Sequence, residues 1–158
     1  SSEIIVDGGA MEIDLKIDYY PTYSILTPHM GELRKFYGYE EVNFLDVNIL
    51  KSLQSEVQER IIVLKSFNTF IITKDMMYIM DRGPSLLATA GTGDVLSGIL
   101  VSLLSQGYSR LEASILGTYL HAEAANYYMD NISKDGMTAS DLIGCIPHAF
   151  NILRKYEQ

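Results

Sequence analysis

The sequence has one cysteine, no tryptophan, and 12 lysine and arginine residues against 20 aspartate and glutamate residues. The lone Cys145 excludes a disulfide within the chain and a cysteine-based metal cluster. The formal net charge of −8 argues against a nucleic-acid or anionic-membrane partner, because such surfaces are bound through basic patches. The longest strongly apolar run, 95–104, is far shorter than the ~20 residues that cross a bilayer. No secretory segment opens the chain, so we expect a soluble, cytoplasmic protein.

What is present suits a folded α/β domain. Of 158 residues, 47% are hydrophobic and 20% are charged, which is typical of a globular chain. Neither a repeat nor a linker divides the sequence, and we therefore predict one domain over residues 1–158. The strand-like Ile4-Ile5-Val6 stands almost at the start with no initiator methionine before it. This start suggests a processed or truncated piece of a longer chain.

Strand and helix patterns alternate along the chain, which favours an α/β layer architecture. The expected strands are 3–7, 23–26 and 61–64, followed by a hairpin of 70–73 and 77–80 at the edge of the sheet. The expected helices are 30–37, a longer one capped by Asn43 that ends near 58, one from 91 to 106, one from 109 to 129, and one that opens at 138–141.

The segment Gly91-Thr92-Gly93-Asp94 precedes an apolar helical pattern. Glycines let the backbone approach a ligand closely, and the free N–H groups of a first helical turn form an anion site. A carboxylate beside a phosphate is unfavourable unless it has a chemical role. One such role is to accept the proton of a hydroxyl that attacks a phosphoryl group. The alternative is that Asp94 caps the helix and the glycines only form a turn; the segment alone leaves both open.

The segment from Thr27 to Glu32 lies between an expected strand and an expected helix, where doubly wound sheets bind ligands. His29 and Glu32 are three residues apart, so a helical turn places them on one face. The imidazole can then hydrogen-bond a polar ligand, and Glu32 can hold a hydrated magnesium ion. The alternative is a simple helix start, with Thr27 as the cap, Pro28 as the first helical residue and Glu32 in the first turn.

Three further positions carry less information by themselves. Lys65 ends a buried strand and can meet a nucleotide phosphate as a point charge, although such a lysine also commonly solvates a strand end. His121 shares a helix face with apolar residues, and we expect a hydrogen-bonded core residue there. His148 follows Pro147 and is expected at the surface.

Together these segments resemble the ADP/ATP-dependent NAD(P)H-hydrate dehydratases, a family with a ribokinase-like fold. The specific pair is 88–98 together with 27–32, because kinase relatives usually have asparagine where His29 stands. The resemblance spans nearly all of the chain but only about the C-terminal half of the family's domain. It implies a layered sheet with flanking helices that lacks its N-terminal part. The resembling segments are 4–7, 27–32, 65–69, 88–98, 121–124 and 139–142.

The resemblance implies repair of hydrated NADH or NADPH. ADP or ATP, with Mg²⁺, phosphorylates the ring hydroxyl, and elimination of phosphate restores the double bond. By resemblance, His29 and Asp94 contact the hydrated dinucleotide, Asp94 is the base on its hydroxyl, and Glu32 lies near magnesium. Ser66 departs from the glycine that the family usually has there. The residues implied in binding the adenine nucleotide are Lys65, Ser66, Phe67, Asn68, Thr69, Gly91, Thr92 and Gly93.

Two other functions stay open at this point. One is a small-molecule kinase of the same superfamily that acts on a vitamin-precursor alcohol, for which His29 is a poor match. The other is a catalytically inactive fragment that serves as a nucleotide-binding or structural subunit. The exposed sheet edges that a missing half would leave favour a homo-oligomer.

Overall fold

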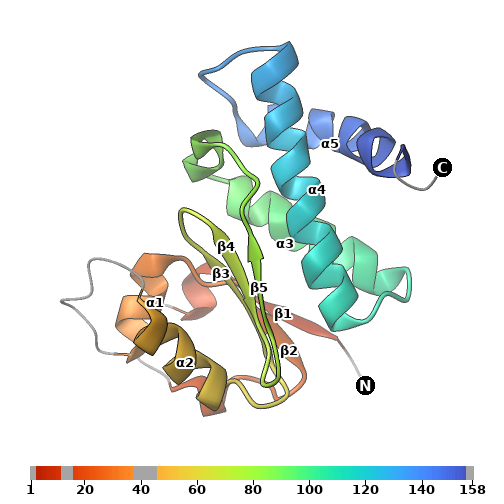
Figure 1. Ribbon diagram of the computed structural model, residues 1–158. Helices are drawn as coiled ribbons and strands as arrows, with labels where there is room; N and C mark the ends of the chain where they lie inside the picture. The colour runs from red at the N-terminus through yellow and green to blue at the C-terminus, as the bar shows by residue number, and fades with distance from the viewer. Residues whose placement is uncertain (1–2, 12–15, 38–45, 156–158) are drawn as a thin grey trace. The chain divides into compact units, whose positions relative to one another are not determined.

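Figure 1 shows the computed structural model of the chain, which describes residues 3–11, 16–37 and 46–155. The backbone forms two compact units, Ser1–Ile79 and Met80–Gln158. The first contains the strands and two helices, and the second is helical. Across the described ranges, no helix combines the length and the apolar character that spanning a lipid bilayer demands.

Within the described residues the sheet has five strands, which follow one another in chain order from β1 to β5. β1, β2 and β3 are parallel, and β4 runs antiparallel to β3. Runs of isoleucine and valine explain these strands, because β-branched side chains suit a pleated surface. The predicted strands and the predicted edge hairpin are confirmed. Their bounds are β1 Ile4–Val6, β2 Ser24–Leu26, β3 Ile61–Lys65, β4 Thr69–Ile72 and β5 Met77–Met80.

Helices α1 (Met30–Tyr37) and α2 (Val47–Glu56) lie on the same side of the sheet in Figure 1. Leu33 of α1 and Leu53 of α2 are 4% and 1% exposed and belong to one hydrophobic core with residues of β1 to β4. The described part of this unit also has two short 3-10 turns, Gly8–Met11 and Ile17–Tyr19. Packing of α1 and α2 in this core therefore fixes the positions of the strand ends.

The start of α2 differs from the prediction. Asn43, the predicted cap, lies outside the described residues. The helix is capped instead by Asp46, whose Oδ1 accepts the N–H of Ile49 at 2.9 Å. Aspartate and asparagine are both good caps, so composition alone did not select between the two positions.

The second unit contains helices α3, α4 and α5 after a 3-10 turn, η3. The long α4 packs against both α3 and α5 (Figure 1). Ser109 and Glu112 form a capping box at the start of α4, and Thr138 and Asp141 form one at the start of α5. Hydrogen bonds from the capping hydroxyls and N–H groups lower the pKa of both carboxyls. The bounds are η3 Ser85–Ala88, α3 Thr92–Ser105, α4 Arg110–Asn131 and α5 Ala139–Arg154.

The close approach of α3 and α4 depends on Gly117. A Cβ atom there would lie 2.8 Å from Cδ2 of Leu100, which is fully buried. We expect Gly117→Val to lower the free energy of unfolding by about 1–3 kcal/mol, as overpacking of a core does. Gly144→Val is the matched control, because a Cβ at this helical glycine meets nothing within 4 Å. Urea unfolding that shows equal effects of the two substitutions would contradict this prediction.

Candidate functional site

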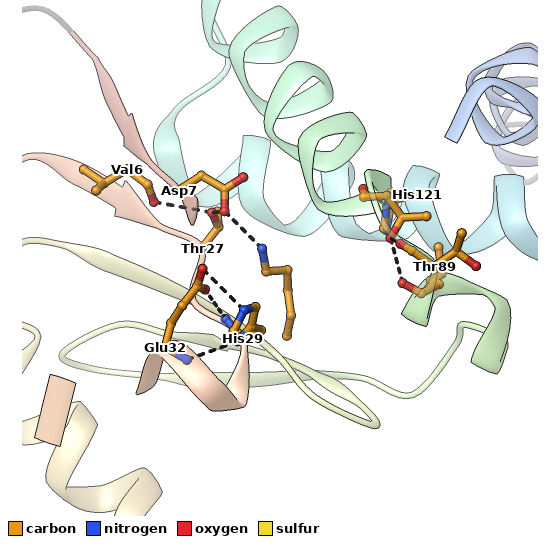
Figure 2. Close-up of polar contacts among 10 residues, drawn as sticks. Val6, Asp7, Thr27, His29, Glu32, Thr89 and His121 are labelled. Carbon is orange, nitrogen blue, oxygen red and sulfur yellow. Dashed lines mark hydrogen bonds and ion pairs between the residues drawn. The ribbon is translucent and has the colours of Figure 1, made fainter. Parts of the chain in front are cut away.

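Three polar side chains gather where the parallel strands β1, β2 and β3 end. Oδ1 of Asp7 accepts the hydroxyl of Thr27 at 2.6 Å and lies 3.0 Å from the ammonium nitrogen of Lys65 (Figure 2). The backbone N–H of Lys65 donates to the carbonyl of Pro28 at 2.8 Å. The carboxyl ends of parallel strands are the usual ligand-binding edge of such sheets. The first unit therefore presents a cation at this edge that is partly neutralised by Asp7.

His29 and Glu32 form a reciprocal cap at the start of α1, as Figure 2 shows. The backbone N–H of His29 donates to Oε2 of Glu32 at 2.8 Å, and the N–H of Glu32 donates to Nδ1 of His29 at 3.1 Å. Because Nδ1 accepts, the proton of the neutral ring is on Nε2, which lies 3.4 Å from Oε1 of Glu32. The alternative in which Thr27 caps this helix is wrong, since the Thr27 hydroxyl bonds Asp7.

The two members of this cap differ in exposure. The side chain of His29 is 58% exposed, whereas that of Glu32 is 6% exposed. Gly31 leaves room for the ring, since a Cβ there would lie 2.9 Å from Cε1 of His29. The pKa of the Tyr20 hydroxyl is raised, mainly by burial and to a smaller extent by the nearby negative charge of Glu32. The imidazole is thus the group that a ligand can reach, and Glu32 holds it.

The segment after Lys65 is the turn between β3 and β4. Lys65 pairs with Thr69 across the antiparallel ladder, so Ser66, Phe67 and Asn68 form the loop. Phe67 is 97% exposed. Among the described non-glycine residues only Gln58 has a positive φ, so the backbone at Ser66 does not require the glycine that the family usually has. The loop is accessible to a ligand, and its nucleotide contacts stay a prediction.

In the second unit, three residues fix the start of α3. Gly91 is the residue before the helix and has a left-handed backbone with φ of 85°. The hydroxyl of Thr92 donates to the carbonyls of Leu87 and Thr89 at 2.7 and 2.8 Å. Nε2 of His121 lies 2.8 Å from the carbonyl oxygen of Thr92, and His121 is 8% exposed (Figure 2). The prediction that His121 is a hydrogen-bonded core residue is confirmed, and His148 is exposed as predicted.

The first turn of α3 leaves polar groups available to a ligand. Within the part of the chain that the structure describes, the N–H groups of Gly93 and Asp94 and the carboxylate of Asp94 have no hydrogen-bond or ion-pair partner. Asp94 is exposed and lines a pocket of about 500 Å³ between α3 and α5. The interpretation of Asp94 as a capping acid is therefore wrong. A carboxylate beside two free N–H donors can accept a proton while the donors hold an anion.

The described residues do not form a dedicated cation site. No group of three or more histidine, cysteine, aspartate or glutamate side chains among them could hold a metal ion. The Glu32 carboxylate is buried and engaged by His29. Magnesium commonly binds through substrate phosphates and water with one or two carboxylates. The predicted role of Glu32 near magnesium stays a prediction.

The structure brings the predicted residues together in two groups, one in each unit. His29, Glu32 and Lys65 lie around the strand ends of the first unit, and Gly93 and Asp94 lie at the start of α3 in the second. Sequence reasoning missed Asp7 as a partner of Lys65. The available signal was that Asp7, like Thr27, directly follows a parallel strand.

The fold is that of the ribokinase-like proteins. A ribokinase-like superfamily protein from Enterococcus faecalis superposes on 93% of this chain with a TM-score of 0.75 and 22% identity. An ADP/ATP-dependent NAD(P)H-hydrate dehydratase from Bacillus subtilis, co-crystallised with ATP and Mg²⁺, superposes on 94% of this chain and 54% of its own, with a TM-score of 0.74 and 28% identity.

Residues 1–148 match the NAD(P)H-hydrate dehydratase family, and the chain belongs to this family. A bifunctional NAD(P)H-hydrate repair enzyme from Dictyoglomus turgidum is 31% identical over 94% of this chain. An ADP-dependent (S)-NAD(P)H-hydrate dehydratase from Neisseria meningitidis is 35% identical over 82% of this chain. The chain spans only 30% of the first of these relatives and 44% of the second. The predicted resemblance is confirmed.

Thr92 provides a test of how the start of α3 is held. Thr92→Val keeps the shape of this buried side chain but removes its hydroxyl, so we expect the free energy of unfolding to fall by about 1–2 kcal/mol. Exchange of the Val95 amide proton, which donates to the carbonyl of Gly91 at 3.2 Å, should become faster. Thr92→Ser keeps the hydroxyl and should preserve slow exchange at Val95. Valine and serine variants with the same exchange rate at Val95 would show that the hydroxyl does not hold this turn.

Proposed function

We propose that this chain is the part of an NAD(P)H-hydrate dehydratase that carries its phosphoryl-transfer residues. The observation that supports this most is the pair of free N–H groups at Gly93 and Asp94 beside the free, pocket-lining carboxylate of Asp94. Family membership supports the substrate class: hydrated NADH or NADPH together with ADP or ATP. The whole chain then represents one partial ribokinase-like domain.

In this proposal, Asp94 is the catalytic residue. Its carboxylate accepts the proton of the ring hydroxyl as that oxygen bonds to the terminal phosphorus of the nucleotide and the bond to the leaving phosphate oxygen breaks. The N–H groups of the first turn of α3 stabilise charge on the transferred group. Loss of phosphate from the ring carbon, with loss of a proton from its neighbour, restores the double bond. The exposed imidazole of His29 contacts the dinucleotide.

The adenine nucleotide is assigned to two segments. Lys65 supplies a positive charge whose present partner, Asp7, holds its ammonium 3.0 Å away, and the exposed loop of Ser66, Phe67 and Asn68 leads from it to Thr69. Gly91, Thr92 and Gly93 form the anion-binding turn. Mg²⁺ would be held by the nucleotide phosphates, which commonly bind this ion; the B. subtilis dehydratase was co-crystallised with ATP and Mg²⁺. We also propose a cytoplasmic homo-oligomer with neither a nucleic-acid nor a membrane partner.

Asp94 provides the test of this function. The chain is assayed alone and joined to the part of the B. subtilis dehydratase that has no counterpart here, with hydrated NADH, ADP or ATP, and Mg²⁺. Recovery of the dinucleotide absorbance and release of phosphate are expected in the joined form. Asp94→Asn should lower turnover by roughly 10²–10⁴, the usual effect of losing a general base. Asp130→Asn, an exposed carboxyl of α4, is the control and should leave turnover unchanged.

Three outcomes would contradict parts of the proposal. A stable phosphorylated product without phosphate release would favour a small-molecule kinase. Nucleotide binding without turnover in the joined form would favour an inactive binding subunit. An Asp94→Asn variant with nearly the parent rate would remove Asp94 from the role of base.

A further inference from the structure

The reciprocal cap at the start of α1 has a histidine where serine or threonine is usual. In the common capping box, a hydroxyl accepts the N–H group three residues further on, and a glutamate side chain accepts the N–H group of the capping residue. Here Nδ1 of His29 replaces the hydroxyl and accepts the N–H of Glu32 at 3.1 Å, while Oε2 of Glu32 accepts the N–H of His29 at 2.8 Å (Figure 2). Capping alone does not require an imidazole, so the ring has a further use.

The cap selects one tautomer of the His29 ring. Nδ1 accepts the N–H of Glu32 only while it carries no proton, because a proton there would place two donors face to face. The proton of the neutral ring is therefore on Nε2. This atom lies 3.4 Å from Oε1 of Glu32, but no hydrogen bond joins the two, and within the described ranges the Nε2–H group has no acceptor. The ring thus offers a hydrogen-bond donor from a side chain that is 58% exposed.

The position of the ring is fixed by Gly31 and by the neighbouring strand. A Cβ atom at Gly31 would lie 2.9 Å from Cε1 and 3.2 Å from Nδ1 of His29, so the ring occupies space that a larger residue would fill. The backbone of His29 forms an isolated parallel bridge with Lys65. The free donor is therefore held at the carboxyl ends of the parallel strands, where such sheets bind ligands.

The Glu32 carboxylate is arranged to serve this ring. Its side chain is 6% exposed, and its two oxygens face the N–H group and Nε2 of His29. A hydrated magnesium ion keeps several waters and needs a carboxylate that those waters can reach, which suits this buried group poorly. We propose that Glu32 is a positioning residue, which holds His29 so that Nε2–H donates to an oxygen of the hydrated dinucleotide. The ligand in this inference rests on the proposed function, whereas the role of Glu32 toward the ring does not.

The role of Glu32 is tested by ¹⁵N NMR of the His29 ring in the chain itself, without a ligand and at a pH at which the ring is neutral. We expect widely separated resonances for the two ring nitrogens, with the proton on Nε2. Glu32→Ala should bring the two resonances together, because the ring is no longer held in one tautomer. Glu32→Gln should keep them apart, since an amide oxygen can also accept the N–H of the capping residue.

Gly31→Ala disturbs the ring without removing any polar group. Its Cβ displaces the ring from the N–H of Glu32, so the two nitrogen resonances should approach each other as in Glu32→Ala. The helix itself is retained, because alanine favours a helix more than glycine does. Gly144→Ala is the matched control, since a Cβ at this helical glycine meets nothing within 4 Å, and it should leave the His29 resonances as they are.

Kinetics test the ligand, with the chain joined to the unmatched part of the B. subtilis dehydratase as in the assay of Asp94. We expect Glu32→Ala and Gly31→Ala to raise the KM for hydrated NADH roughly three- to tenfold, as loss of one hydrogen bond does. The KM for ADP and the Mg²⁺ concentration that gives half the maximal rate should stay near the parent values. Glu32→Gln should restore the KM for hydrated NADH.

Two results would overturn the role of Glu32. One is a proton on Nδ1 in the parent chain. The other is a higher Mg²⁺ requirement in both Glu32→Ala and Glu32→Gln with the ring resonances of the parent, because a magnesium ligand needs the negative charge and the cap does not. If the joined protein does not turn over hydrated NADH, the proposed function and its ligand fail, while the NMR comparison decides the role of Glu32 separately.

Discussion

The hydroxyl of Thr92 and the ring of His121 fix the point at which α3 begins. Thr92 donates to the two carbonyls of the preceding turn, its own carbonyl lies 2.8 Å from Nε2 of His121, and Gly91 adopts the left-handed backbone that lets the chain enter the helix. These contacts satisfy the groups around the turn but not the N–H groups of Gly93 and Asp94. A helix start that is rigid yet incompletely paired can bind an anion, and in the proposed function the Asp94 carboxylate beside it is the base.

In the first unit, the group available to an anion is a charged side chain and not a set of backbone N–H groups. The parallel strands bring Asp7, Thr27 and Lys65 together from distant parts of the sequence. An ion pair with Asp7 positions the Lys65 ammonium at the strand ends. In the proposed function, a nucleotide phosphate that binds Lys65 competes with Asp7 for the ammonium group. Glu32 similarly holds the imidazole of His29 while leaving most of that side chain exposed.

Local patterns predicted the elements and part of the site. The three-residue spacing of His29 and Glu32 correctly placed them together, and the glycines around Thr92 correctly predicted the start of α3. The pairing of Asp7 with Lys65 could not be predicted, because 58 residues separate them and only the parallel sheet brings them together. The start of α2 was wrong because Asp46 competes with Asn43 as a cap, and local composition does not rank the two.

The central claim, that the start of α3 binds the nucleotide phosphates, is tested most directly by following backbone amide resonances by NMR during a titration with ADP and Mg²⁺. The account predicts that the resonances of Gly93 and Asp94 move saturably with ADP and stay in place with adenosine, which lacks phosphate. Equal movement with both compounds, or no movement at Gly93 while resonances elsewhere shift, would contradict it.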